Sequence, residues 1–146
     1  MSETENVAAA KRLYEEVFTG GDIAVLNSIA IDDLVFHDPT MKEFRGGLQT
    51  FKEREAMFFN AFPDKKSTID DLIPNGDKVV VRWTTTGTHQ NELPGVAPTL
   101  KPINVSGISI LRFDNGKIAE IWQYWDELAL LNQLGVQVPK VAAETR

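Results

Sequence analysis

The turn Asp114-Asn115-Gly116 limits the possible folds of this chain more than any other feature. An Asn-Gly pair between two runs of strand-forming residues is a strong hairpin signal, because tight hairpin turns need positive φ at their central positions. The flanking runs cover residues 103–113 and 117–126. The sequence therefore predicts a pair of adjacent strands near the end of the chain.

Aromatic and polar side chains alternate at the end of the second run. Strand alternation places Ile121, Gln123 and Trp125 on one face and Trp122 and Tyr124 on the other. If the first face lines a cavity, Gln123 is a polar group in a mostly apolar wall. That arrangement is typical of a small-molecule site.

Length and charge exclude several classes of protein. The 146 residues fit one domain, which we place at residues 1–137, followed by a loose tail at 138–146. The net charge is −6, and Lys and Arg are scattered, so nucleic acid is not an expected partner. The chain has no cysteine, and its acidic first residues and its apolar runs lead us to expect neither a signal sequence nor a segment that crosses a bilayer. We expect a cytoplasmic protein with no membrane partner.

Helical spacing of apolar residues predicts helices early in the chain. The first includes Leu13 and Tyr14 and ends at Gly20-Gly21; the second starts at an Asp22 N-cap. A short strand at 34–37 closes with Asp38-Pro39, and a further helix, opened by Gly46-Gly47, ends near residue 63.

Strands dominate the second half of the sequence. They are expected at 67–73, 78–88, 103–113 and 117–126, with a Gly/Pro-rich loop at 89–100 and a final helix at 127–134. Helices followed by strands indicate an α+β fold: a curved antiparallel sheet wrapped around the N-terminal helices. A cavity between the two layers would be walled by Tyr14, Trp83, Trp125 and phenylalanines.

Several segments, in order, resemble the SnoaL-like polyketide cyclases, also called ester cyclases. They are the stretches 33–39, 62–64, 76–83, 87–89, 95–99 and 112–135. The resemblance covers about residues 6 to 137. It implies the cone-shaped fold shared with ketosteroid isomerase and the nuclear transport factor, with one deep pocket and commonly a homodimer.

The same resemblance implies site residues. The catalytic aspartate of the aromatic polyketide cyclases falls at Gln123, which cannot exchange a proton. Their neighbouring histidine falls at Ser109. In the ketosteroid isomerase pattern the helix tyrosine matches Tyr14, the base before a proline matches Asp38, and the oxyanion-hole aspartate again falls at Ser109. Asp38, Tyr14 and Ser109 are thus the predicted catalytic residues.

Four residues are predicted to contact substrate: Gln123, Trp83, Trp125 and His37. Each predicted site residue also has an ordinary structural interpretation. Asp38 could cap a turn before Pro39, and the tryptophans could be plain core. Strand alternation sends His37 and Asp38 to opposite faces, so His37 enters the pocket only if the strand twists or ends there. The alternative is a solvent-facing or core His37.

Other polar residues have simpler expected roles. Arg82 and the threonines at 84, 86 and 88 form a stripe that suits solvent or a dimer interface. His89 is expected to be solvated in its loop, and Asp126 to cap the last helix. Two histidines without metal-ligand spacing, and no glycine-rich phosphate loop, predict no metal and no nucleotide cofactor.

Three functions remain open. The first is proton abstraction beside a carbonyl of a small hydrophobic compound, leading to isomerisation or aldol closure, with Asp38 as base. The second is binding of a hydrophobic molecule or scaffolding of a partner, without catalysis. The third is epoxide hydrolysis, which needs paired carboxylates and an arginine. It ranks last because the sequence shows no second pocket carboxylate.

Overall fold

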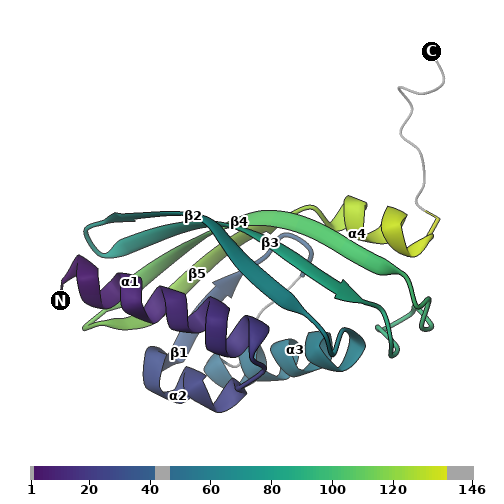
Figure 1. Cartoon of the computed structure of the whole chain (residues 1–146). Helices are drawn as coiled ribbons and strands as arrows, with labels where there is room; N and C mark the ends of the chain where they lie inside the picture. The colour runs from purple at the N-terminus through teal and green to yellow at the C-terminus, as the bar shows by residue number, and fades with distance from the viewer. Residues whose placement is uncertain (1, 42–46, 138–146) are drawn as a thin grey trace.

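The computed structural model describes residues 2–41 and 47–137. A helical layer packs against one face of a curved sheet that does not close into a barrel (Figure 1). The predicted α+β class is confirmed. The predicted tail at 138–146 and Gly46 of the predicted helix start lie outside the described residues.

The N-terminal helices match the apolar periodicity of their sequence. They are α1 (Glu3–Arg12), the π-helical segment η1 (Leu13–Thr19), the 3-10 segment η2 (Ile23–Val25), α2 (Leu26–Ile29) and α3 (Gly47–Ala61). Ser2 caps α1 through the Glu5 amide. Asp22 is at the predicted N-cap position of η2, but its side chain makes no cap hydrogen bond.

Within the described residues, five strands form one sheet in the order β1-β5-β4-β3-β2. Their bounds are β1 Ala30–His37, β2 Lys66–Asn75, β3 Lys78–Thr88, β4 Pro102–Asp114 and β5 Lys117–Trp125. The predicted hairpin of β4 and β5 is confirmed, and Asn115 and Gly116 both have positive φ. The sheet differs from the expected antiparallel sheet at one edge, where strand β1 pairs parallel to β5. No hairpin joins these two strands, so their local sequence does not set their relative direction.

The last helix, α4 (Glu127–Leu134), follows β5 directly. Asp126 accepts from the Ala129 amide, and Gly135 ends the helix in the left-handed conformation, so both predicted ends are confirmed. Across the described part of the chain, no helix has the length and apolarity needed to cross a bilayer.

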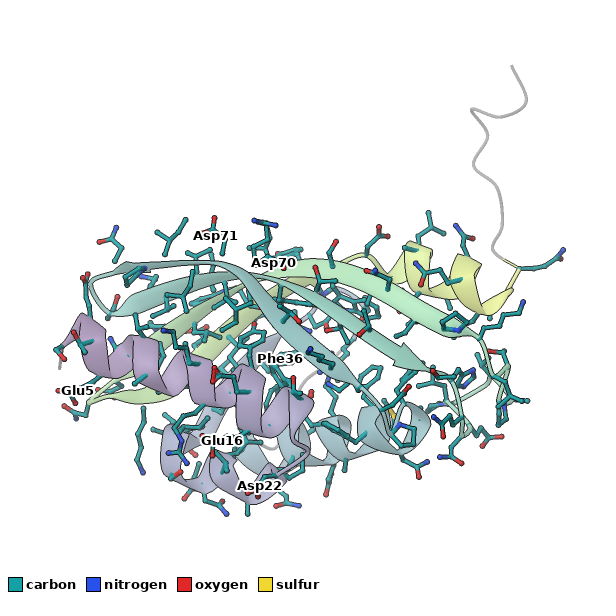
Figure 2. All side chains as sticks on the ribbon, viewed as in Figure 1. Glu5, Glu16, Asp22, Phe36, Asp70 and Asp71 are labelled. Atoms are coloured by element: carbon teal, nitrogen blue, oxygen red, sulfur yellow. The ribbon has the colours of Figure 1, made fainter. Side chains whose placement is uncertain are left out.

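Buried apolar side chains form two clusters. The larger fills the space between the N-terminal helices and the sheet and includes Phe36, which Figure 2 shows between the layers. The smaller gathers around Phe62 and Leu130, between α4 and the first residues of β4. Trp125 packs against both clusters. On the opposite face of the sheet Figure 2 shows the carboxylates of Asp70 and Asp71.

Candidate functional site

A pocket opens where the two apolar clusters meet, and its cavity volume is about 70 Å³. Residues from η1, α3, the turn after α3, the inner face of the sheet and α4 line it. They are Tyr14, Phe18, Arg54, Glu55, Phe58, Phe62, Lys65, Ser67, Trp83, Thr85, Ile103, Val105, Gln123, Trp125 and Leu130. The wall is thus mostly apolar, with a few polar groups, as in small-molecule sites.

The two tryptophans of the wall lie on either side of a glycine. Trp83 on β3, Gly107 on β4 and Trp125 on β5 are neighbours in register. A Cβ at Gly107 would lie 2.5 Å from Cζ2 of Trp83 and 2.8 Å from Cβ of Trp125. Gly107 therefore leaves the space that the Trp83 ring occupies on the inner face of the sheet.

Ser109 and Gln123 form a polar pair two residues along the same two strands, the next pair on the inner face of the sheet. Trp83 donates from Nε1 to Ser109 Oγ at 3.0 Å, and Ser109 Oγ donates to Gln123 Oε1 at 3.3 Å. Among the described residues none accepts a hydrogen bond from the Gln123 amide nitrogen. That NH₂ group is the available donor of the pair, and Gln123 is on the pocket wall.

Tyr14 presents an unpaired hydroxyl in the pocket. Its side chain is 1% exposed, and its hydroxyl has no hydrogen-bond partner within the described part of the chain. Burial raises the pKa of Tyr14; the nearby Ser109 hydroxyl opposes the rise and the Glu55 charge adds to it. The phenol therefore stays protonated and can donate. It lies on the π-helical segment, a feature often found at functional sites.

Asp38 is buried but does not line the pocket. The Thr40 amide and hydroxyl donate to its Oδ1 at 2.9 and 2.7 Å. Arg54 and the Trp125 indole donate to its Oδ2 at 3.1 and 3.0 Å. The carboxylate thus accepts from four donors, two of which belong to Arg54 and Trp125, residues that line the pocket. Asp38 therefore fixes the positions of these two lining residues through hydrogen bonds.

Three charged residues of the wall were missed by the sequence analysis: Arg54, Glu55 and Lys65. Arg54 donates to Glu55 at 2.5 Å and to Asp38, and its guanidinium lies 4.7 Å from the centroid of the Phe36 ring. Lys65 Nζ lies 3.8 Å from Glu55 Oε1. With Asp38, the group holds two positive and two negative charges, so it is formally neutral.

Glu55 is the second carboxylate that the sequence was expected to lack. It is 2% exposed and lines the cavity, so that expectation is wrong. A signal was present in the sequence: Phe51, Glu55, Phe58 and Phe62 are spaced three or four residues apart, which puts a carboxylate on the apolar face of α3. Lys65 follows the helix and has no such periodic signal.

The two histidines lie elsewhere. His37 is on the outer face, stacked on Trp122 and 2.6 Å from Glu120, so the structure does not bring it to the pocket with the other predicted substrate contacts. His89 is 0% exposed, so the expected solvated histidine is wrong. The loop folds back on itself: the His89 amide donates to the Lys101 carbonyl at 3.0 Å, and His89 Nδ1 accepts from the Thr99 amide at 3.2 Å. No three His, Cys, Asp or Glu side chains gather as a metal site within residues 2–41 and 47–137.

Comparison with known protein families gives a result that agrees with this fold. The model of the SnoaL-like polyketide cyclase family matches residues 8–134. The chain belongs to that family. Among curated proteins, none matches the chain significantly.

Solved structures share the fold over nearly the whole chain. A proposed polyketide cyclase from Acidithiobacillus ferrooxidans is 31% identical, with a TM-score of 0.82 over 92% of this chain and 98% of that one. IdmH, a proposed polyketide cyclase from Streptomyces antibioticus, is 29% identical, with a TM-score of 0.76 over 93% and 100%. AclR, a proposed hydroxylase from Streptomyces galilaeus, is 26% identical, with a TM-score of 0.80 over 94% and 100%. Neighbours of this one fold thus carry different proposed reactions.

Proposed function

We propose that this protein binds a small, neutral, largely apolar carbonyl compound and abstracts a proton beside the carbonyl group. The product is an isomer or a ring closed by intramolecular aldol addition. Family membership supports the reaction class, and the formal neutrality of the charged wall group supports an uncharged ligand.

The buried, unpaired hydroxyl of Tyr14 is the observation that carries the proposal. Leaving such a group unpaired costs about 1–3 kcal/mol, and a ligand oxygen would remove that cost. With the carbonyl oxygen near Tyr14 and the free NH₂ of Gln123, both donors would stabilise the negative charge that develops on proton abstraction. Trp83 and Trp125 would hold a flat ring and exclude water.

We place the base at Glu55 rather than at Asp38. Glu55 lines the pocket, and its charge acts on Tyr14, whereas Asp38 is surrounded by four donors behind Trp125 and Arg54. Asp38 would serve as base only if Arg54 and Trp125 released it. Ser109, predicted as a catalytic residue, would instead position Gln123, because its hydroxyl donates to Gln123 Oε1.

Deuterium exchange tests the proposal without knowledge of the natural substrate. 1-Indanone, a neutral ring ketone, is incubated with the protein in D₂O near neutral pH, and loss of its α-proton signal is followed by NMR. We expect exchange faster than in buffer, and its loss in Glu55→Gln but not in Glu53→Gln, an exposed site on the same helix. Circular dichroism checks that each variant is folded, and Glu55→Asp provides a second variant that keeps the carboxylate.

Binding without catalysis is the second candidate. Its support is that the charged side chains of the pocket wall pair with one another, as an inert structural network would. Quenching of tryptophan fluorescence by 1-indanone without α-proton exchange would favour this function and exclude the first.

A further inference from the structure

Lys65 is an amine held at the pocket wall with its side chain only 9% exposed. Its Nζ lies 5.1 Å from the centroid of the Phe18 ring and 4.9 Å from that of Phe59. A lysine in such surroundings is unusual, because an ammonium ion loses much of its hydration there.

The backbone around Lys65 is fixed from both sides. Its amide donates to the Phe62 carbonyl at 2.9 Å, and the Asp64 carboxylate accepts from the Thr88 amide and hydroxyl at 2.8 Å each. Two residues further on, Ser67 donates its amide to Thr19 on η1 at 2.9 Å. The turn is therefore tied to β3 and to the helix that carries Tyr14, which keeps Lys65 at the cavity.

We infer that Lys65 is an imine-forming residue: its amine condenses with the carbonyl group of the ligand, with Glu55 as the neighbouring proton acceptor. This deepens the proposed function, on whose carbonyl ligand it rests. A lysine activated by desolvation and by a nearby cation is a known way to make such a nucleophile, and Arg54 is the nearby cation here. Burial lowers the pKa of Lys65; Glu55 opposes that change and Arg54 adds to it.

The step balances within the site. Nζ gives one proton to Glu55 and forms a C–N bond to the carbonyl carbon, and a second proton passes from the nitrogen to the carbonyl oxygen to give a carbinolamine. Glu55 returns its proton to the hydroxyl group, which leaves as water, so that a protonated imine remains and Glu55 is again a carboxylate. This cation acidifies the adjacent C–H bond, so Glu55 can remove that proton to give an enamine. The enamine is reprotonated or adds to a second carbonyl, and water then releases the product and restores Lys65.

Reductive trapping tests the inference. Benzaldehyde has no α-proton and serves as the probe; cyanoborohydride converts its imine to a stable secondary amine, which peptide mass spectrometry locates. The exposed neighbour Lys66 is the internal control. A lowered pKa gives Lys65 a larger neutral fraction near pH 7 than an ordinary lysine has, so we expect labelling of Lys65 to exceed that of Lys66. Equal labelling of the two residues overturns the inference, and this comparison needs only the wild-type protein.

Exchange of the 1-indanone α-protons separates this inference from the proposed function. Lys65→Arg keeps the positive charge but cannot form an imine, and Lys66→Arg is the matched control. Loss of exchange in Lys65→Arg alone, with tryptophan quenching by 1-indanone retained, supports the imine. Exchange at the wild-type rate in Lys65→Arg overturns the imine and leaves the proposed function standing. Absence of exchange in the wild type refutes both.

Discussion

Trp125 donates its indole N–H to Asp38 Oδ2 at 3.0 Å and so joins the end of β5 to the residue that follows β1. The two residues are 87 positions apart in the sequence. Trp125 also lines the pocket and packs against both apolar clusters. One buried carboxylate therefore fixes the orientation of a wall residue, and Arg54 shares the same oxygen.

Asp38→Asn is expected to reduce the free energy of unfolding by about 3 kcal/mol, since it removes one partner of a buried ion pair. The amide also cannot accept from donors on both sides, because one of its two positions becomes NH₂. Urea unfolding measures the effect. Asp33→Asn, at an exposed position of β1, is the control and should change stability by no more than about 0.5 kcal/mol. Equal, small changes in the free energy of unfolding for the two variants would show that Asp38 does not fix Arg54 and Trp125 in the pocket wall.

Tyr14→Phe should separate stability from ligand binding. The lost hydroxyl has no partner, so the free energy of unfolding should stay constant or rise by up to about 1 kcal/mol. Affinity for 1-indanone, measured by tryptophan quenching, should fall about fivefold, the effect of one hydrogen bond. Tyr124→Phe is the matched control, because Tyr124 is 64% exposed on the outer face. A clear loss of stability in Tyr14→Phe would mean that the hydroxyl is already paired in the free protein.

The strands could be predicted from sequence because their signals are local. Alternation in residues 121–125 gave the inward face correctly, and the turn at 114–116 gave the hairpin. The parallel pairing of β1 had no local signal, because its partner lies more than eighty residues away along the chain. The buried state of His89 also depends on a feature that is not local in sequence, the folding of its loop back on itself through hydrogen bonds to Leu100 and Lys101.

The site was predicted only in part, for a similar reason. Tyr14, Trp83, Gln123 and Trp125 lie on faces that periodicity identifies, and all four line the pocket. The charged group does not follow from periodicity alone: Arg54 is set by two carboxylates on different elements, and Lys65 by the turn that ties α3 to β3. Glu55 had a visible signal, a charged residue on an apolar helix face.

We expect a homodimer through the outer face of the sheet. Ile108 on β4 and Tyr124 on β5 are cross-strand partners there, 48% and 64% exposed, and Arg82 pairs with Ile108 from β3. Light scattering at micromolar concentration should give the mass of two chains. Ile108→Asp should give one chain, because it would bury a charge in the interface. Leu128→Asp, at an exposed leucine of α4, is the control and should remain dimeric. A wild type that is monomeric under these conditions would contradict the expectation.

Lys65 should make stability depend on pH in a direction set by its lowered pKa. The native state binds this proton less tightly than the unfolded chain, so the unfolded chain holds more protons between the lowered native-state pKa and the ordinary value of about 10.4, and stability rises with pH in that window. Relative to Lys65→Met, the wild type should therefore gain free energy of unfolding as the pH rises toward about 10.4. Urea unfolding at a series of pH values measures the free energy of unfolding of each protein. In the difference between the two values, the contributions of groups that titrate in both proteins cancel. For Lys66→Met, at an exposed lysine, the difference in free energy of unfolding from the wild type should not change with pH. A flat difference for Lys65→Met as well would show that Lys65 keeps an ordinary affinity for its proton, and the amine would then lack the activation that imine formation requires.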